Sequence, residues 1–416
     1  MHWINAPDVS PGFFTLMKIL FAVNMPFPEG RASTRRIRTI AREMVRQGHK
    51  VSILLPFSRE PKAKNKIIDG IYVRWCLTPS KKAEFQTINK RVKLSIQFLS
   101  RFRWMMELWL KSKRKEYDWL YLYQPGIDGL IAARIARYFG RRILSEYVDL
   151  FSSDEYDTPI WRIFYKLQVF ADRKVPFYSN IILTISSVLK NIYQYRNPDV
   201  PILIFPTLVD TSKFGKGDPY RYRQELSLGN RTVISFTGSF VRTEGLHVLI
   251  EAIANVLKRN HDLILLIAGG SLVPKSDDAG QLIKQYRLQT NALYLGALSE
   301  EDVIDLQAAS DILVMPKLDA PVNHAGLSTK LAEYLASEKP VIASNVGDVG
   351  KYLIDGQDAL LIPPGNRNAL EIALLRLLKD RELCNVLGAN GRKKAIQHFG
   401  IEANVMRLMN ILLSYN

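Results

Sequence analysis

The strongest constraint on the fold is a repeated alternation of short apolar runs with amphipathic stretches of helical length. Residues 18–24 predict a buried strand, residues 33–47 a helix and residues 51–56 the next strand. Near-continuous apolar strands joined by helices are typical of parallel sheets with right-handed crossovers. The sequence therefore predicts an α/β fold of the doubly wound kind. Residues 67–76 are expected to add one more strand to the opening sheet.

The alternation runs twice, once on each side of a charged segment at 211–230, and 416 residues exceed what one core usually serves. We predict four parts, which are an N-terminal extension (1–16), a Rossmann-like domain (17–207), a second Rossmann-like domain (208–400) and a C-terminal helix that packs back on the first domain (401–416). Ligands of such sheets bind beyond the carboxyl ends of the strands. The two domains are therefore expected to face a central cleft.

Composition excludes several classes of protein. Apolar residues make up 47% and charged residues 23% of the chain, which argues against bulk disorder. Cys76 and Cys384 lack the spacing of a disulfide framework or a zinc site, which suits a reducing cytoplasm. No apolar run reaches the roughly 18 residues that span a bilayer, and residues 1–16 lack the basic region of a secretory signal. We expect a cytoplasmic protein.

The net charge of +17 is concentrated in one segment. Residues 81–116 contain eleven basic and three acidic residues together with many bulky apolar ones, including Trp104 and Trp109. This pattern predicts a basic amphipathic helix that lies on an anionic membrane surface, peripheral to the inner face of the cell membrane. A long core helix with a solvated face is the alternative. Nucleic-acid binding is less favoured, because the charge is clustered with apolar residues instead of being interleaved along a groove.

Residues 326–340, GLSTKLAEYLASEKP, form a loop and helix that lie between two apolar strands. Leu327, Leu331 and Leu335 recur at helical spacing, whereas Lys330 and Glu333 share another stripe. A helix N-terminus after a parallel strand commonly binds phosphates. The alternative is a packed helix with a surface Lys330–Glu333 salt bridge. The chain contains neither G-x-G-x-x-G nor a Walker loop, which disfavours dehydrogenases and kinases.

Several strings, taken in order, carry a family resemblance. They include IFPTLVDTSKF from residue 204, FTGSFVRTEGLHVLIEA from residue 236 and STKLAEYLASEKPVIASNVGDVGKYLIDGQDALLIPPGN from residue 328. From about residue 17 to its end, the chain resembles the retaining glycosyltransferases of the family 4 type, which have the GT-B fold and use nucleotide sugars. The resemblance implies an acceptor-binding first domain, a donor-binding second domain, no cofactor besides the nucleotide-sugar substrate, and no bound metal.

The resemblance also implies a donor site. Glu333 matches the glutamate that holds the ribose hydroxyls, which is sensible because a carboxylate accepts two hydrogen bonds. Backbone N–H groups at the start of the same helix would hold the diphosphate. Gly30 matches the family's glycine-containing loop, which approaches both the donor phosphates and the acceptor. The donor-binding residues expected on this basis are Gly30, Gly238, Ser239, His324, Gly326, Leu327, Ser328, Thr329 and Glu333.

The chain also departs from the family pattern. Ala325 stands where many relatives carry another glutamate, and Ser239 and Glu244 stand where relatives usually carry an arginine and a lysine. Since a leaving diphosphate gains negative charge, other cations must replace them, and Arg242 and Lys330 are the candidates. Asp149 is expected near the transferred sugar. Glu146 and Asp149 are three residues apart and would point to opposite faces of a strand, so only one can face the cleft, and Asp149 is preferred because it lies at the strand end.

The expected function is transfer of a sugar from a nucleotide diphosphate donor to a hydroxyl of a glycan or polyprenyl-diphosphate-linked acceptor, with retention. The expected setting is biosynthesis of cell-surface polysaccharide, meaning lipopolysaccharide, capsule or exopolysaccharide. Two alternatives stay open. Ser239 and Glu244 suggest a non-catalytic GT-B scaffold or accessory subunit, and the same fold also hosts sugar-nucleotide epimerases.

Overall fold

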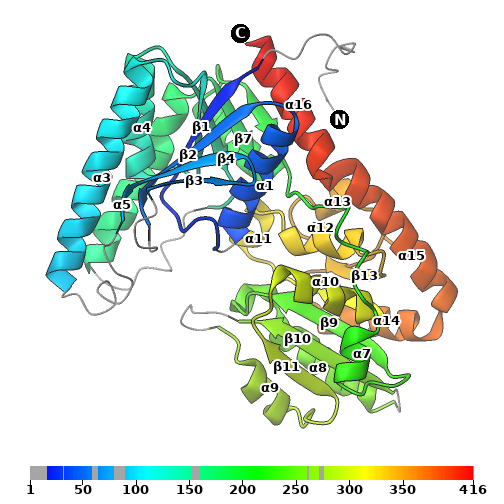
Figure 1. The fold of residues 1–416 in the computed structure, drawn as a ribbon. Helices are drawn as coiled ribbons and strands as arrows, with labels where there is room; N and C mark the ends of the chain where they lie inside the picture. The colour runs from blue at the N-terminus through cyan, green and yellow to red at the C-terminus, as the bar shows by residue number, and fades with distance from the viewer. Residues whose placement is uncertain are drawn as a thin grey trace. The chain divides into compact units, whose positions relative to one another are not determined.

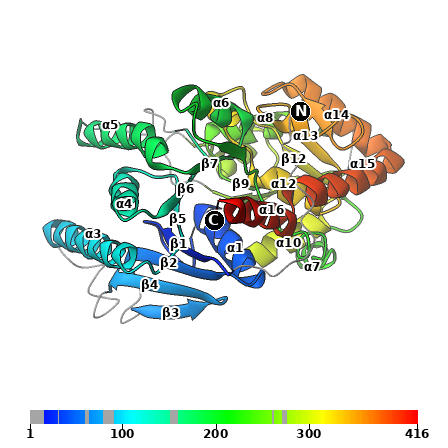
Figure 2. The same cartoon turned by 90° about the horizontal axis from the view of Figure 1, so that it is seen from above.

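A computed structural model describes residues 16–30, 32–58, 64–78, 90–150, 159–259, 262–270 and 276–415. The chain divides into two compact units, each with its own core (Figures 1 and 2). Unit 1 comprises Met1–Glu146, Ser153–Ile182 and Val405–Asn416, and unit 2 comprises Tyr147–Ser152 and Leu183–Asn404. The predicted boundary at 207/208 stays a prediction, and the predicted extension lies, except for residue 16, outside the described residues.

The first sheet has eight strands in the order β3-β4-β2-β1-β5-β6-β7-β8. The strands are β1 (Lys18–Ala22), β2 (Lys50–Phe57), β3 (Asn65–Ile68), β4 (Ile71–Leu77), β5 (Trp119–Tyr123), β6 (Arg142–Tyr147), β7 (Ile181–Thr184) and β8 (Ile202–Ile204). β1 pairs in parallel with β2 on one side and with β5 on the other. β2 in turn pairs in parallel with β4, and β5 pairs in parallel with β6. The chain order around β1 is that of a doubly wound sheet.

The prediction of one strand over 67–76 is wrong. β3 and β4 form an antiparallel hairpin, with Asp69 and Gly70 as its two-residue loop. Their φ angles are 53° and 77°, and an Asp-Gly pair supplies the positive φ that such loops require. The dipeptide was visible in the sequence and is the signal that should have divided the strand.

Helices cover the first sheet. They are α1 (Ala32–Arg46), α3 (Lys90–Lys113), α4 (Ile127–Tyr138), α5 (Pro159–Lys174), the 3₁₀ helix η2 (Val175–Tyr178) and α6 (Ser187–Arg196). The predicted helix over 81–116 is present as α3, whereas residues 81–89 lie outside the described residues. Trp104 and Leu108 of α3 are buried in the core, and the Trp104 indole N–H donates to the Leu54 carbonyl at 3.0 Å. One face of α3 is thus a core face.

The second sheet has the order β11-β10-β9-β12-β13-β14, and its neighbouring strands pair in parallel. Its strands are β9 (Thr232–Gly238), β10 (Leu263–Gly269), β11 (Ala292–Gly296), β12 (Ile312–Met315), β13 (Val341–Ser344) and β14 (Leu360–Ile362). In chain order this is the 3-2-1-4-5-6 arrangement of a Rossmann-type sheet, whose strand order reverses between β9 and β12. The crevice beyond these two strands is therefore the expected ligand position.

Unit 2 also contains α7 (Arg221–Glu225), the 3₁₀ helix η3 (Arg242–Glu244), α8 (Leu246–Leu257), α9 (Ala279–Gln285), α10 (Glu300–Ala309), α11 (Pro321–Ala325), α12 (Thr329–Ala336), α13 (Val349–Tyr352), α14 (Arg367–Lys379), α15 (Arg381–Lys394) and the π-helical η4 (Ala395–Phe399). α16 (Ile401–Ser414) ends the chain, and its residues from Val405 belong to unit 1. Two doubly wound sheets and this returning helix confirm the predicted fold class.

Candidate functional site

The carboxyl ends of β9 and β12 bring the predicted donor loop and helix together. β9 ends at Gly238, and α12 follows the loop after β12. The Thr237 backbone N–H donates to the Tyr334 hydroxyl at 2.8 Å, and the Thr237 hydroxyl lies 3.0 Å from the same oxygen. Tyr334 is fully buried, and burial raises its pKa. These bonds fix α12 against the end of β9.

Lys330 is a buried cation at this position. Its Nζ lies 2.6 Å from Glu244 Oε2 and 4.3 Å from the centre of the Phe236 ring. Gly238 has φ of 125°, and a Cβ placed there would lie 3.1 Å from Lys330 Nζ. Glycine is therefore required by both backbone conformation and contact. The alternative of a surface Lys330–Glu333 salt bridge is wrong, because Lys330 is buried and pairs with Glu244.

Glu244 joins two lysines, of which Lys317 lies in the loop after β12 and Lys330 lies in the first turn of α12. Lys317 Nζ lies 2.6 Å from Glu244 Oε1 and donates to Asn323 Oδ1 at 3.0 Å. The Asn323 amide in turn donates to the carbonyls of Thr243 and Leu318, both at 2.9 Å. The loop after β9 is thereby tied to the loop after β12. Two ammonium groups facing one carboxylate leave one net positive charge in the cluster.

The electrostatics of this cluster follow from burial and pairing. Burial alone would raise the pKa of Glu244, but Lys330 and Lys317 lower it to about 2. Burial lowers the pKa of Lys330, and Glu244 opposes that change. Glu244 is therefore ionised at neutral pH and helps Lys330 to keep its proton. We call Glu244, Lys317, Asn323 and Lys330 the lysine cluster.

The N-terminus of α12 supplies the other predicted donor-binding groups. Ser328 is the N-cap residue, and its side chain makes no capping hydrogen bond. The Leu331 N–H donates to the Ser328 carbonyl at 3.2 Å, so the N–H groups that could bind another acceptor are those that precede it, of Ser328, Thr329 and Lys330. The Leu327 side chain is buried, which anchors the loop. Gly326 and Thr329 flank this pair, and the half-buried Glu333 follows Lys330 by almost one turn.

Three further predicted residues lie on the same loops but outside the lysine cluster. Arg242 is exposed in η3, and Ser239 is exposed with its hydroxyl accepting from the Val241 N–H at 3.4 Å. His324 is half-exposed, and its Nε2 lies 2.6 Å from Asp319 Oδ1. Ala325 is fully buried. The sequence did not point to Lys317 and Asn323, although Lys317 lies only two residues beyond the end of β12.

The residues expected on the acceptor side lie on loops that follow the first sheet's strands. Gly30 is exposed after β1, and a Cβ there would collide with the Thr34 side chain, whose hydroxyl donates to the Pro26 carbonyl at 2.9 Å. Asp149 lies two residues beyond β6, is exposed, and accepts from the Leu150 N–H at 2.9 Å. The absence of a side chain at Gly30 lets this loop close over Thr34.

Glu146 is buried and paired, and its side chain does not face solvent. Its Oε1 lies 2.6 Å from a guanidinium nitrogen of Arg36, and its Oε2 accepts from the Tyr121 hydroxyl at 2.6 Å. Glu146 and Tyr121 are fully buried, and Arg36 is nearly so. Glu146 is therefore committed to a buried ion pair. The sequence did not identify Arg36, whose partner is 110 residues away.

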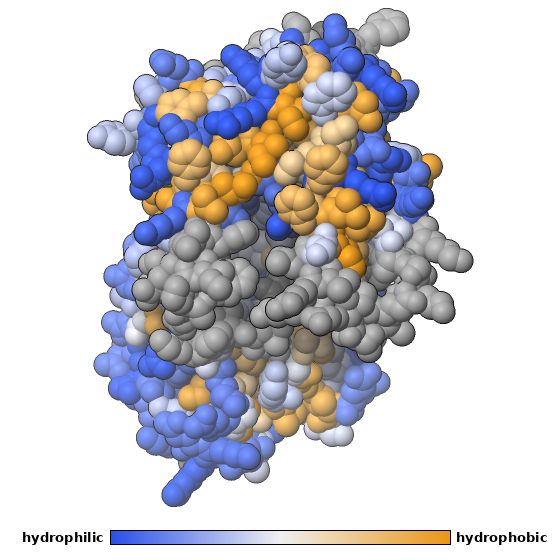
Figure 3. Space-filling model, turned by 90° about the vertical axis from the view of Figure 1, so that its left-hand side faces the viewer, coloured by the Kyte–Doolittle hydropathy of each residue, from blue (hydrophilic) through white to orange (hydrophobic). Residues whose placement is uncertain are grey.

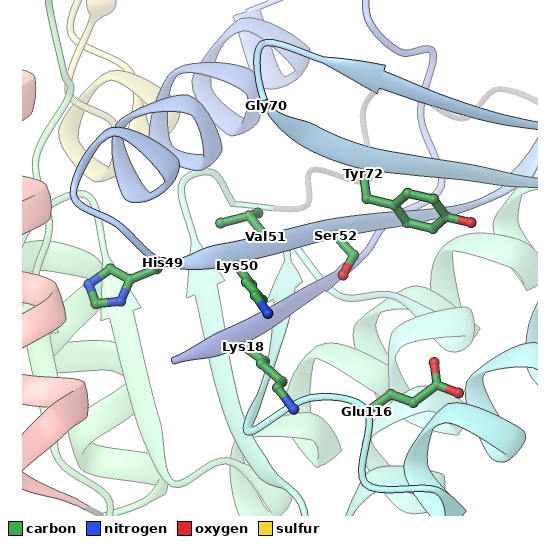
Figure 4. Close-up of a pocket in the computed structure, with 8 residues that line it drawn as sticks. All are labelled: Lys18, His49, Lys50, Val51, Ser52, Gly70, Tyr72 and Glu116. Carbon is green, nitrogen blue, oxygen red and sulfur yellow. The ribbon is translucent and has the colours of Figure 1, made fainter. Parts of the chain in front are cut away.

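A pocket of about 460 Å³ lies elsewhere, at the amino ends of β1 and β2 (Figure 4). It is lined by Lys18, His49, Lys50, Val51, Ser52, Gly70, Tyr72 and Glu116. His49 is buried, its Nδ1 accepts from the Met17 N–H at 3.4 Å, and burial lowers its pKa. Because ligands of such sheets bind at the carboxyl ends, we do not assign this pocket to the site.

Among the described residues, no group of three or more His, Cys, Asp and Glu side chains has an arrangement that suits a metal ion. None of the helices that the structure describes combines the length and apolar character needed to cross a membrane.

The lysine cluster lies in a segment of the chain that matches a family of known proteins. The family model "Glycosyl transferases group 1" matches residues 221–394, which contain all four cluster residues. Residues 221–394 form a group 1 glycosyltransferase domain. An uncharacterized glycosyltransferase of Methanocaldococcus jannaschii is 31% identical over 179 residues, which cover 42% of this chain and 46% of that protein. The alpha-D-kanosaminyltransferase of Streptomyces kanamyceticus is 24% identical, covering 44% of this chain and 45% of its own length.

Solved structures extend the likeness beyond the group 1 domain. Sucrose-phosphate synthase from Thermosynechococcus elongatus superposes with a TM-score of 0.73 at 18% identity, covering 96% of this chain and 99% of that one. Anabaena HepE in complex with UDP-glucose gives a TM-score of 0.69 at 18% identity, covering 96% and 100%. These likenesses confirm the GT-B fold. The chain spans about half of the length of the curated relatives it matches.

Proposed function

We propose that this protein is a retaining glycosyltransferase that moves a sugar from a nucleotide diphosphate donor to a hydroxyl of a glycan or lipid-linked acceptor. The observation that carries the proposal is the buried Lys330 beyond the carboxyl end of β9, next to Gly238 and in the first turn of α12. A fixed cation beside a helix N-terminus suits a diphosphate. The group 1 match of the same segment supports it.

Each group has a defined task in the proposed donor complex. The N–H groups of Ser328 and Thr329 and the Lys330 ammonium hold the diphosphate, while the Glu333 carboxylate accepts hydrogen bonds from the ribose hydroxyls. Arg242, which is exposed on η3, adds positive charge from the opposite loop. HepE was crystallised with UDP and with UDP-glucose, so these are the first compounds to test.

The proposed reaction needs no nucleophile from the protein. The bond between the anomeric carbon and the diphosphate breaks, and the acceptor oxygen forms its bond on the same face of the sugar. The acceptor proton passes to the departing phosphate. Lys330 stabilises the negative charge that grows on the leaving group, which is the largest electrostatic demand of the step. Asp149 and Gly30 are proposed to lie on the acceptor side.

We propose cell-surface polysaccharide biosynthesis as the setting. Relatives by sequence include the capsular polysaccharide biosynthesis glycosyltransferase CapM of Staphylococcus aureus, and relatives by fold include WaaG, a glycosyltransferase involved in lipopolysaccharide biosynthesis. A polyprenyl-diphosphate-linked glycan is the proposed acceptor class.

Thermal unfolding against a panel of UDP-, GDP- and dTDP-sugars tests the donor, because a bound ligand stabilises the folded state. One sugar nucleotide is expected to raise the unfolding temperature of the wild type. Lys330→Met is expected to abolish that rise, whereas Lys284→Met, which changes an exposed lysine of α9, is expected to leave it unchanged. If no sugar nucleotide stabilises the wild type, the scaffold alternative gains.

Incubation with the identified donor separates transfer from epimerisation. In the presence of membrane-derived glycolipid, mass spectrometry is expected to find an acceptor heavier by one sugar. Without acceptor, the donor sugar is expected to keep its configuration. Isomerised sugar nucleotide under these conditions would refute the transferase assignment and favour the epimerase.

A further inference from the structure

We propose that unit 1 docks on an anionic lipid bilayer through an outer helical face built from α3, α5 and η2. This face is defined by the exposed apolar side chains Phe98, Leu99, Phe102, Met106, Leu167, Phe170 and Phe177. The proposal concerns where the protein acts and is independent of the proposed sugar transfer. Within the basic segment at 81–116, the residues assigned to the lipid contact are the exposed apolar ones of α3, which are Phe98, Leu99, Phe102 and Met106.

The two faces of α3 have different partners. Trp104 and Leu108 point into the core, with exposures of 2% and 0%. Phe98, Phe102 and Met106 are exposed by 75%, 54% and 46% and recur every four residues, offset by two from the buried pair. An offset of two residues is about 200° around a helix, so this stripe lies on the opposite side. Trp104, although part of the basic segment, therefore does not belong to the exposed apolar stripe.

The apolar surface continues onto α5. Leu167 and Phe170 are exposed by 45% and 48%, and Phe177 of η2 by 63%. α4 packs against both α3 and α5, which joins them on one side of the sheet (Figure 2). Figure 3 looks onto this side and shows a broad apolar band across it. An apolar surface of this breadth is characteristic of an interaction site.

The same helices carry much of the chain's positive charge. The sequence of α3 has seven basic residues and one acidic residue, and that of α5 has four and one. These two helices thus account for more than half of the net charge of +17. Arg103, Lys166 and Arg173 are exposed beside the apolar side chains. A surface that is both apolar and cationic matches an anionic lipid bilayer, into which aromatic rings insert while basic groups reach the headgroups.

A second copy of the chain is a poorer occupant of this face. Symmetric dimers pair the same patch on both subunits, so the positive charges would face each other. A bilayer containing anionic lipid offers apolar depth and opposite charge together. The geometry therefore points to lipid as the partner of the outer helical face.

Co-sedimentation of the full chain with vesicles tests the proposal. We expect binding to vesicles of phosphatidylglycerol and phosphatidylcholine, little binding to phosphatidylcholine alone, and weaker binding at high salt. Phe102→Ser with Phe170→Ser is expected to weaken binding about tenfold or more. Ile372→Ser is the control, because Ile372 of α14 in unit 2 is also an exposed apolar residue, with 68% exposure against 54% for Phe102 and 48% for Phe170.

A second pair of variants tests the charge. Lys166→Glu with Arg173→Glu is expected to reduce binding, whereas Arg259→Glu with Lys284→Glu, which makes the same charge change in unit 2, is expected to leave it nearly unchanged. Circular dichroism and thermal unfolding establish that each variant is folded. Equal binding by the control and test pairs, equal binding to neutral vesicles, or a concentration-dependent dimer that Phe102→Ser dissolves would overturn the proposal.

Discussion

Replacing Glu244 by glutamine removes the charge that holds Lys317 and Lys330 together. The pKa of Glu244 is about 2, against an ordinary value of 4.5. This difference corresponds to about 3 kcal/mol of folding stability, at about 1.4 kcal/mol per pKa unit. Because the folded-state pKa lies below the unfolded one, this stabilisation is present above pH 4.5 and is lost as the pH falls towards 2.

Glu244→Gln also acts on Lys330. Without the carboxylate, burial is opposed by less negative charge, so the pKa of Lys330 falls further below its ordinary value. Donor binding that needs the ammonium form should then be lost at a lower pH than in the wild type. The alkaline limb of the binding profile is expected to shift to lower pH.

Urea unfolding at pH 7, followed by circular dichroism, measures the first effect, and nucleotide titration from pH 6 to pH 10 measures the second. Glu225→Gln is the control, because Glu225 pairs with Arg221 at 3.3 Å on the surface and its loss should cost less than about 1 kcal/mol. If Glu244→Gln matches the wild type in both measurements, the description of the lysine cluster is wrong.

Three further predictions concern packing and backbone. Glu146→Gln should lower the free energy of unfolding, measured in urea, by about 3–5 kcal/mol, because it removes the carboxylate that pairs with the buried Arg36 guanidinium. Gly238→Ala should lower the unfolding temperature and weaken nucleotide binding, whereas Gly229→Ala, also at positive φ but with nothing near its Cβ, should leave nucleotide binding unchanged. Trp104→Ala should cost about 3–5 kcal/mol in urea, and Phe102→Ala on the opposite face of α3 about 0.5 kcal/mol or less.

Much of the fold was predictable because local patterns and burial agree along the chain. β12 and β13 coincide with short apolar runs of the sequence, and the three-residue spacing of Ser299 and Asp302 forms a capping box, with the Ser299 hydroxyl accepting from the Asp302 N–H. In a parallel sheet each strand is buried on both faces, so its apolar run is nearly continuous. Such runs are readable without any knowledge of the partner strands.

The lysine cluster was only half predictable. Lys330 and the helix start were accessible from the sequence because they are neighbours in one segment. Lys317 and Glu244 are separated by 73 residues, and only the β9–β12 pairing in the sheet brings their loops together. Arg36 and Glu146 are likewise far apart in the sequence, by 110 residues, and meet only in the folded chain. A sequence shows which residues carry charge, but the strand order decides which charges meet.

The basic helix shows a different limit. Composition alone left a membrane-facing helix and a core helix as alternatives, and α3 has both a buried apolar face and an exposed apolar face. Since both faces are apolar, periodicity could not decide which one packs on the sheet. The position of Trp104 decides it, through its hydrogen bond to Leu54.

Lys330 and the first turn of α12 are proposed to hold the donor diphosphate. Calorimetric titration of the wild type and Lys330→Met with the nucleoside diphosphate and monophosphate of the preferred base tests it directly. The wild type should bind the diphosphate at least about tenfold more tightly, which is about 1.4 kcal/mol, and Lys330→Met should lose that preference. An unchanged preference for the diphosphate in Lys330→Met would show that Lys330 does not hold the diphosphate.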